Sequence, residues 1–251
     1  MDKISAVIIA YNEERRIAAT LRALDFCDEI VVVDSGSTDA TVSICRQFNC
    51  RIFTRAFDGY GTQKEFAVSK ASNDWVLAID ADEIISDALK REIISAFSTG
   101  PGNVQGFYLP ISLVFLGKIL RFGGEYKKPH LRLFNRTAGT FTRDRVHEHV
   151  EIQGIKTRLK NHILHDSYDD IRDYLAKFND YTSIAAEALF QKGRSSAKLN
   201  VFVRFPLTFL KIYFVKGCLF DGYQGLVWSL FSSLYHVVKF AKLLEKQAAL
   251  P

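Results

Sequence analysis

Several features that mark common protein classes are missing from this chain of 251 residues. Its four cysteines form neither a Cys-x-x-Cys pair nor a zinc-ligand spacing, so we expect buried apolar thiols in a reducing compartment. The N-terminus lacks the architecture of a signal peptide, which predicts a protein kept in the cytosol. No Gly-x-Gly-x-x-Gly follows the first expected strand and no P-loop motif occurs. These absences argue against dinucleotide-binding and P-loop enzymes.

The composition is that of a globular protein with an uneven charge distribution. Hydrophobic residues make up 48% and charged residues 24%, as in globular proteins, and 251 residues are enough for one sizeable domain or a domain with an appendage. The net charge is +5, yet residues 192–246 alone carry nine Lys or Arg against two acids. This basic, aromatic C-terminal piece predicts an anionic surface as partner, which we take to be a membrane and not nucleic acid.

A short apolar run followed by three carboxylates is the most informative stretch. Trp75 to Ile79 reads as a strand buried on both faces, and it is followed by Asp80, Asp82 and Glu83. We expect these carboxylates at the C-terminal end of the strand, where open α/β sheets bind ligands. Asp80 and Asp82 are two positions apart and can converge on a divalent cation. The alternative is a polar strand end before a helix, for which Ser86 is the expected N-cap.

Strand and helix patterns alternate through the first hundred residues. Apolar strands are expected at 4–10, 29–33, 51–54 and 75–79, each followed by a helical or turn pattern. This alternation predicts an α/β fold with a parallel sheet and helices on both faces. The polar strand ends at 11–13, 34–36 and 80–82 then line one edge of that sheet.

The pattern changes after residue 100. Further strands are expected at 106–110, 114–116, 130–134 and 160–164, followed by a helix at about 169–191 and an apolar, basic stretch at 199–244. We therefore expect a catalytic domain at 1–167, composed of halves 1–100 and 101–167. Residues 168–251 are expected to form a helical region that associates with a membrane.

Three ordered motifs carry a family resemblance. They are Val-Ile-Ile-Ala-Tyr-Asn-Glu-Glu at 7–14, Val-Val-Val-Asp-Ser-Gly-Ser-Thr-Asp-Ala-Thr at 31–41 and Trp-Val-Leu-Ala-Ile-Asp-Ala-Asp-Glu at 75–83. The chain resembles family 2 inverting glycosyltransferases with the GT-A fold, whose sheet is mixed and Rossmann-like. More narrowly, residues 63–67, 132–134, 147–148 and 210–225 are similar to bacterial lipopolysaccharide-core β-1,4-glucosyltransferases.

The resemblance implies a donor site and a metal site. Transfer would take a hexose, expected to be glucose, from a UDP-sugar to a lipid-linked saccharide of the lipopolysaccharide or lipooligosaccharide inner core. The implied metal ligands for Mg²⁺ or Mn²⁺ are Asp82 and His165. Donor-binding residues implied by the resemblance are Tyr11, Glu13, Asp34, Lys64, Asp80, Ala81 and Arg132.

Inversion requires a general base that deprotonates the acceptor hydroxyl as it attacks the anomeric carbon. Glu148 is the first candidate and Asp144 the second. Simpler interpretations stay open for the cations: Lys64 as a solvated helix residue and Arg132 as a structural ion pair. His165 could equally be an ordinary core or surface histidine.

Other functions are compatible with parts of the pattern. The acceptor could be another polyprenyl-linked or cell-surface glycan. A sugar-phosphate nucleotidyltransferase shares the architecture but would need a Gly-rich basic loop, which residues 11–14 lack. A non-catalytic membrane-surface glycan-binding module is the third possibility. In the C-terminal piece no uncharged run reaches the roughly 20 apolar residues of a membrane span, so we expect peripheral attachment to anionic lipid at the inner face of the cytoplasmic membrane. A buried core helix would explain the same apolar stripe.

Overall fold

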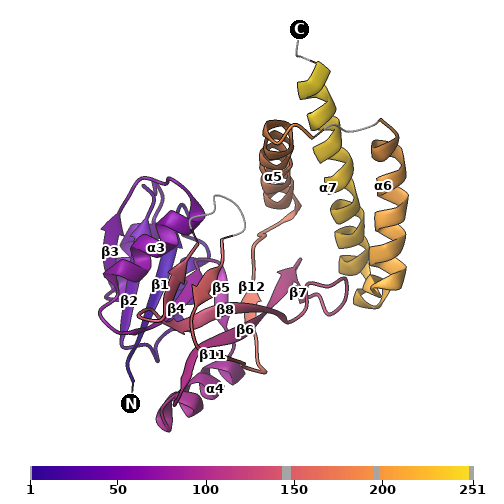
Figure 1. The fold of residues 1–251 in the computed structure, drawn as a ribbon. Coiled ribbons are helices and arrows are strands. Elements are labelled where there is room, and N and C mark those ends of the chain that lie inside the picture. The colour runs from indigo at the N-terminus through magenta and orange to yellow at the C-terminus, as the bar shows by residue number, and fades with distance from the viewer. Residues whose placement is uncertain (1, 143–147, 195–197, 249–251) are drawn as a thin grey trace. The chain divides into compact units, whose positions relative to one another are not determined.

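The computed structural model describes residues 2–142, 148–194 and 198–248, and the chain divides into two compact units. The first unit contains residues Met1–Ser112 and Lys127–His165. The second contains Leu113–Tyr126 and Asp166–Pro251. Figure 1 shows both units, coloured along the chain.

The first unit is built on a mixed sheet. Its strands are β1 (Ile4–Ala10), β2 (Glu29–Asp34), β3 (Arg51–Thr54), β4 (Trp75–Asp80), β5 (Glu83–Ile85), β6 (Val104–Phe115), β8 (Lys128–Asn135), β11 (Ile155–Arg158) and β12 (Ile163–His165), with a separate hairpin of β9 (Gly139–Phe141) and β10 (Val150–Ile152). The strand order is β3-β2-β1-β4-β8-β6-β12-β5, with β11 beside β6. The pairs β3-β2, β2-β1 and β1-β4 are parallel, whereas β8 lies antiparallel to β4.

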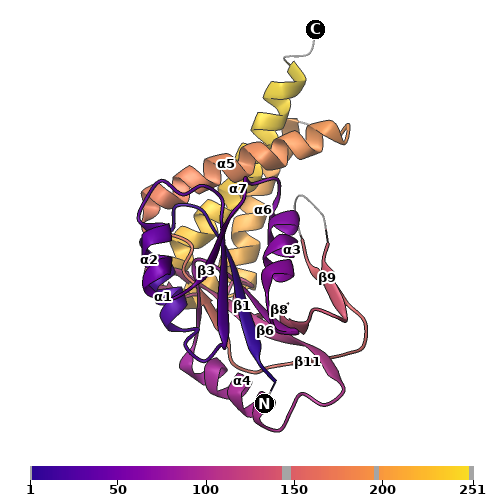
Figure 2. The same cartoon turned by 90° about the vertical axis from the view of Figure 1, so that its left-hand side faces the viewer.

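Helices cover both faces of this sheet. They are α1 (Ile17–Arg22), α2 (Thr41–Gln47), α3 (Tyr60–Lys70) and α4 (Asp87–Ser98). Apolar side chains of α1, α2 and α4 share one core with the sheet, and α3 shares a second core that includes the β9-β10 hairpin. Figure 2 shows α1 and α2 on one side of β1 and β3, and α3 with β9 on the other.

The local patterns predicted from sequence are confirmed in the first hundred residues. The four expected strands are β1 to β4, with β2 and β4 each one residue longer than predicted. Ser86 is the N-cap of α4, since its hydroxyl accepts the backbone N–H of Leu89 at 3.3 Å. The α/β fold with a mixed sheet is confirmed: the first four strands pair in parallel, β11 is also parallel to β6, and β8 is antiparallel to both β4 and β6.

Two expectations for the second half need correction. The strands expected at 106–110 and 114–116 are one continuous strand, β6, because Pro110 lies within it without interrupting the pairing to β8. The regular alternation expected at 130–134 is interrupted by a bulge. Phe107 pairs with Leu133 and the next residue, Tyr108, pairs with Leu131, so Arg132 is an extra residue on β8.

The bulge moves side chains to different faces of the sheet. Leu133 packs in the core beneath α4, whereas Leu131 packs in the core beneath α3. In a regular strand, residues two apart would share a face. The extra residue therefore explains why β8 contributes to both cores.

The second unit is helical. It contains α5 (Ile171–Gln191), α6 (Lys198–Leu210), a π-helical turn η1 (Lys211–Val215), a 3-10 turn η2 (Cys218–Asp221) and α7 (Tyr223–Ala248), together with the short strand β7 (Lys118–Ile119), which pairs with the end of β6. Helix α7 packs against both α5 and α6 (Figure 1). No helix in the described part of the chain is long and apolar enough to span a bilayer.

Aromatic rings dominate the core of this second unit. Phe115 and Tyr174 are buried, and Trp228 packs edge-on against the Phe115 ring with centroids 5.4 Å apart. Tyr174 stacks on Phe231 at 4.9 Å. The twenty phenylalanines of the sequence thus include a rigid aromatic cluster that joins the β6-β7 hairpin to α5 and α7.

A buried carboxylate fixes the turn between η1 and α7. Asp221 is 1% exposed and accepts the backbone N–H groups of Arg121 at 3.2 Å and Phe122 at 2.9 Å. Nearby, Gly225 approaches the chain so closely that a Cβ there would lie 1.9 Å from the carbonyl oxygen of Cys218. This contact explains why a glycine occupies the first turn of α7.

The close approach at Gly225 gives a stability prediction. Gly→Ala inside an exposed helix normally stabilises it, but Gly225→Ala must displace the η2 backbone. We expect a loss of about 1–3 kcal/mol in the free energy of unfolding, the range for overpacked sites. Denaturant unfolding followed by circular dichroism measures it. The neighbouring Gln224→Ala is the control, and an equal effect of both variants would refute the close-packing explanation.

Candidate functional site

The ends of β1 and β2 are joined by a hydrogen-bonded pair of loops. The Asn12 side-chain oxygen accepts the Thr38 backbone N–H at 2.8 Å, and the Glu13 backbone N–H donates to the Thr41 hydroxyl at 2.7 Å. Tyr11 is exposed beside them. The first two sequence motifs therefore form one edge of the sheet, as the polar strand ends predicted.

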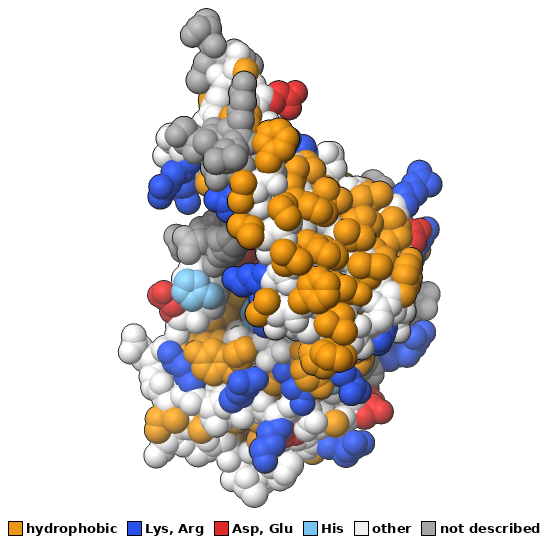
Figure 3. Space-filling model, turned by 90° about the vertical axis from the view of Figure 1, so that its right-hand side faces the viewer, with side chains coloured by type: hydrophobic (Ala, Val, Ile, Leu, Met, Phe, Trp, Pro, Cys, Tyr) orange, Lys and Arg blue, Asp and Glu red, His pale blue; other side chains and the backbone are white. Residues whose placement is uncertain are grey.

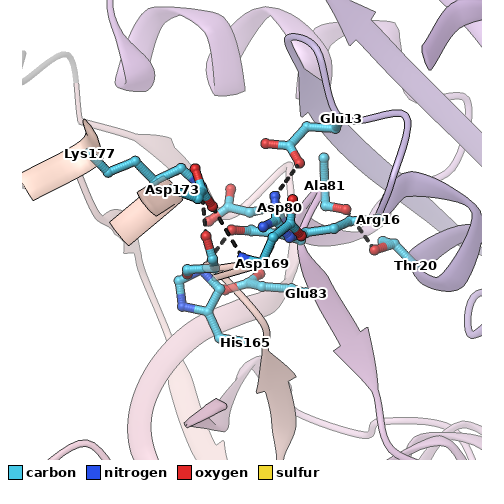
Figure 4. A network of polar contacts seen from close by, with 12 residues as sticks. Glu13, Arg16, Thr20, Asp80, Ala81, Glu83, His165, Asp169, Asp173 and Lys177 are labelled. Atoms are coloured by element: carbon cyan, nitrogen blue, oxygen red, sulfur yellow. Dashed lines mark hydrogen bonds and ion pairs between the residues drawn. The ribbon is translucent and has the colours of Figure 1, made fainter. Parts of the chain in front are cut away.

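Asp34 is buried at the end of β2. Its carboxylate accepts the backbone N–H groups of Gly36 at 3.0 Å and Ser37 at 3.1 Å. The turn requires a positive φ of 92° at Gly36, which glycine adopts at little cost. Asp34 therefore shapes the loop, while the Glu13 carboxylate contacts the Arg16 guanidinium at 3.4 Å (Figure 4).

Asp80, at the C-terminal end of β4, is bound by two cations. The Lys64 ammonium, from α3, lies 2.8 Å from Oδ1, and an Arg132 guanidinium nitrogen lies 2.9 Å from Oδ2. The same Lys64 ammonium contacts Oε1 of Glu148 at 3.0 Å. Helix α3, strands β4 and β8 and the loop before β10 thus bring Lys64, Asp80, Arg132 and Glu148 into one ion-pair network.

Glu83, at the start of β5, is the fifth member of this network. Its carboxylate is 1% exposed, contacts Arg132 at 2.9 Å and accepts the backbone N–H of Asp80 at 2.9 Å. We predicted Glu83 at the open strand end; instead it is buried. Burial is possible because Arg132 supplies the charge partner that an interior carboxylate needs.

The pKa values of the two carboxylates that contact Arg132 shift in opposite directions. Burial would raise the pKa of Asp80, but the Arg132 and Lys64 charges outweigh it and hold that pKa far below its usual value. Burial, with some help from the Asp80 charge, raises the pKa of Glu83 despite Arg132. A protein environment that separates the pKa values of neighbouring carboxylates is typical of functional sites.

Asp82 faces a different partner. Its Oδ2 lies 3.3 Å from Nε2 of His165, which β12 brings alongside β5 by pairing His165 with Glu83. Burial would lower the pKa of His165, but the hydrogen bond to Asp82 and the negative charges of Asp82, Glu83 and Asp80 together raise it to about 9. Asp80 and Asp82 thus contact different cationic partners, Lys64 and Arg132 for the first and His165 for the second.

The fit of a divalent metal ion can be tested on these residues. A carboxylate and an imidazole are suitable ligands for Mn²⁺, and Mg²⁺ commonly takes only one or two protein carboxylates. No cluster of three or more ligating side chains occurs in the described ranges. Asp82 and His165 fit as a two-ligand site, to which a diphosphate and water would contribute the remaining oxygens.

Most predicted site residues lie on this edge, with one outside the described residues. Asp144 falls in residues 143–147, which the structure does not describe. Lys64 is 6% exposed, so it is not a solvated helix residue, and Arg132 does form an ion pair. Ala81 is buried, and its carbonyl accepts the Thr20 hydroxyl at 2.7 Å (Figure 4).

Comparisons with known proteins identify the family. The sequence model "Glycosyl transferase family 2" matches residues 5–149. The "Uncharacterized glycosyltransferase" of Rickettsia felis is 32% identical over 263 residues, covering 98% of this chain and 90% of that protein. The chain therefore belongs to glycosyl transferase family 2, and the protein is a glycosyltransferase with a GT-A-like mixed sheet and a helical C-terminal region.

Two further similarities were found. The "Lipopolysaccharide core biosynthesis glycosyltransferase LpsC" of Rhizobium meliloti is 27% identical, covering 98% of this chain and 93% of that protein. Among solved structures, residues 1–349 of S. aureus TarS in complex with UDP align with a TM-score of 0.49 at 14% identity, covering 98% and 91% of the two chains. The family assignment depends on the sequence matches and not on this structural likeness.

The buried charges predict a pH-dependent stability defect. Arg132→Met leaves Asp80 and Glu83 without their shared cation. We expect a loss of about 3 kcal/mol at pH 7, the low end for a broken buried pair because Asp80 is 26% exposed. In the native protein the lowered pKa of Asp80 stabilises the fold above its unfolded value of about 3.9, and this contribution declines as the pH falls below it. The difference between variant and wild type should therefore shrink below about pH 4.

Urea unfolding at pH 7 and pH 3.5 measures this effect. Arg136→Met is the matched control, because Arg136 lies just beyond β8 and its nearest carboxylate, Asp74, is exposed and 3.8 Å away. A defect of Arg132→Met that is unchanged at the lower pH would show that packing, and not charge, causes it.

Proposed function

We propose that this glycosyltransferase is an inverting, UDP-sugar-dependent hexosyltransferase acting on a lipid-linked saccharide of the lipopolysaccharide or lipooligosaccharide inner core. The observation that carries the proposal is the Lys64–Asp80–Arg132–Glu148 network at the sheet edge of a family 2 chain. Similarity along 98% of the chain to a relative named for lipopolysaccharide core biosynthesis supports the acceptor class. Within this class of enzymes, we propose that the protein is a β-1,4-glucosyltransferase.

The donor nucleotide is proposed to bind at the joined ends of β1 and β2. Glu13 and Tyr11 lie on the first loop, and the buried Asp34 holds the second loop in shape. The pyrophosphate is proposed to lie next to Lys64 and Arg132. Both cations already neutralise Asp80, so an incoming phosphate oxygen would exchange with a carboxylate oxygen of the same charge.

The charge balance supports a divalent cation. The network holds three carboxylates, Asp80, Glu83 and Glu148, but only two cations, Lys64 and Arg132. A diphosphate would add further negative charge. Mg²⁺ or Mn²⁺ held by Asp82 and His165 would offset that charge and stabilise the diphosphate leaving group. His165 must lose the proton that Asp82 favours in order to act as a ligand.

Glu148 is the proposed general base. Its carboxylate is half-buried and is held by Lys64 at 3.0 Å, which keeps it close to the strand end that carries Asp80. In the proposed reaction Glu148 accepts the proton of the acceptor hydroxyl. The hydroxyl oxygen attacks the anomeric carbon from the face opposite UDP, the glycosidic bond to phosphate breaks, and UDP leaves. Asp144 is the second candidate for the base.

Because the proposed acceptor is linked to a lipid, we also propose where the protein is located. We propose that it is made in the cytosol and associates peripherally with the anionic inner face of the cytoplasmic membrane. A polyprenyl-linked or other cell-surface glycan is the alternative acceptor.

UDP release from UDP-glucose, UDP-galactose and UDP-N-acetylglucosamine, measured with Mn²⁺ and purified lipopolysaccharide core, tests the proposed donor and acceptor together. Consumption of UTP without UDP-sugar turnover would indicate a nucleotidyltransferase, and saccharide binding without turnover a non-catalytic module.

The metal site gives the first activity prediction. Asp82→Ala is expected to abolish transfer and the Mn²⁺-dependent part of donor binding while the protein stays folded, because the only predicted carboxylate ligand is lost. Calorimetric titration of UDP with and without Mn²⁺ separates binding from turnover. Asp74→Ala, at the opposite end of β4, is the matched control. Near-normal activity of Asp82→Ala in Mn²⁺ would remove Asp82 from the metal site.

The base gives the second activity prediction. Glu148→Gln keeps the shape of the side chain but cannot accept a proton. We expect turnover to fall by about 10²–10⁴-fold while UDP-sugar binding is retained. Glu151→Gln, an exposed carboxylate on β10, controls for the local change of charge. Wild-type turnover in Glu148→Gln would transfer the role to another residue, Asp144 first.

A further inference from the structure

Helix α6 carries large apolar side chains both where it packs and where it is exposed. On one side, the half-buried rings of Phe205, Phe209 and Tyr213 stack in a row with centroids 6.2 Å and 5.3 Å apart, and α6 packs against α7. Phe202 and Leu207, by contrast, are exposed. A packed helix that also exposes several large apolar side chains is typical of an interaction surface.

The exposed side chains form a continuous surface that we name the outer apolar face. It runs along α6 and over the two following turns. Phe202 is 76% exposed and Val215 is 82% exposed. Figure 3 shows hydrophobic side chains gathered on this face of the molecule, with charged side chains, mostly Lys and Arg, at its edges. Its principal members are Phe202, Leu207, Leu210, Phe214, Val215 and Phe220.

Within the stretch that forms the outer apolar face, residues 202–221, the exposed charges are of one sign. Arg204, Lys211 and Lys216 lie along the same stretch and are exposed. The one acid between residues 198 and 221 is Asp221, and its buried carboxylate is bound by backbone N–H groups. An exposed apolar surface whose own stretch of chain carries exposed cations and no exposed acid is complementary to an anionic lipid interface.

The tip of this face is held in a fixed shape. The Lys216 carbonyl accepts the Gly123 N–H at 3.1 Å, the Lys216 ammonium donates to the Gly123 carbonyl at 3.1 Å, and the rings of Phe122 and Phe220 lie 5.5 Å apart. Exposed aromatic side chains are therefore presented by a braced turn and do not need to be ordered on binding, which lowers the entropic cost of binding.

We propose that the outer apolar face lies in the headgroup–acyl boundary of an anionic bilayer, with Phe202, Phe214 and Phe220 inserted and Lys211 and Lys216 at the phosphates. The inference deepens the proposed function, on which it rests for a lipid-borne acceptor. A second copy of the chain fits less well, because a two-fold interface would bring the same cations together across the contact.

Flotation of the full-length protein with liposomes tests the proposal. The vesicles contain phosphatidylcholine alone or with 30 mol% phosphatidylglycerol as the anionic lipid, at low and at high salt. We expect binding to anionic vesicles that weakens at high salt. Phe214→Ser with Val215→Ser should weaken this binding by about tenfold or more, since each side chain loses its transfer into the apolar layer. Lys211→Glu should weaken it about fivefold or more, and only at low salt.

Matched controls are available on α5. Leu175 and Ile184 are 46% and 52% exposed, so Leu175→Ser with Ile184→Ser removes comparable apolar surface outside the outer apolar face. Lys192→Glu, at the end of α5, matches the charge reversal. Phe202→Ser with Leu207→Ser provides an independent pair if the first pair melts at a lower temperature than wild type.

Each outcome decides the question. Equal loss of binding in the α5 controls, or wild-type binding by both pairs of α6 variants, would overturn the assignment of the surface. A wild-type dimer that becomes monomeric in Phe214→Ser with Val215→Ser would assign the face to a second copy. Vesicle binding is measured without donor or acceptor, so absence of UDP release in the wild type would refute the proposed function and leave the membrane result standing.

Discussion

The Arg132 guanidinium is the interaction on which the sheet edge depends. It lies between the carboxylates of Asp80 and Glu83, and Glu83 also accepts the backbone N–H of Asp80. Without a cation, two carboxylates could not both be ionised at this depth. The bulge on β8 puts Arg132 there, because the extra residue redirects its side chain out of the regular alternation. Lys64 then links the same Asp80 to Glu148. The position of the proposed base is therefore coupled, through one lysine, to the strand that carries the acidic motif.

How much of this was predictable depends on the range of the interaction. Strands β1 to β4 and the Ser86 cap follow from patterns within about ten residues, and sequence analysis located them closely. Residues 11–13, 34–36 and 80–82 were placed on one edge because parallel strands share their C-terminal ends. The partners of the charged groups were not predictable in the same way. The contact of Lys64 with Glu148 spans 84 residues of sequence, and no local pattern signals it.

The bulge and Glu83 show why the remainder was missed. Residues 130–134 alternate well enough to suggest a regular strand, yet Leu131 and Leu133 pack in opposite cores. A one-residue insertion in a ladder leaves no composition signal, since it depends on how β6 pairs with β8. Glu83 looked like a third solvent-edge carboxylate because a buried acid is disfavoured unless it is paired. The sequence did contain the required partner, Arg132, but 49 residues away and on a strand whose register was unknown.

The two units divide the physical tasks of the proposed reaction. The ionised groups proposed for the donor, metal and base all belong to the first unit, where burial and mutual pairing fix their charge states. The outer apolar face belongs entirely to the second unit, where an aromatic core and the Asp221 turn hold it rigid. An enzyme whose donor is water-soluble and whose acceptor is lipid-borne needs both kinds of surface. Water weakens the attraction within an ion pair, so the charged site needs a sheltered environment. The outer apolar face must instead be open to its partner, and placing the two on different parts of the chain satisfies both requirements.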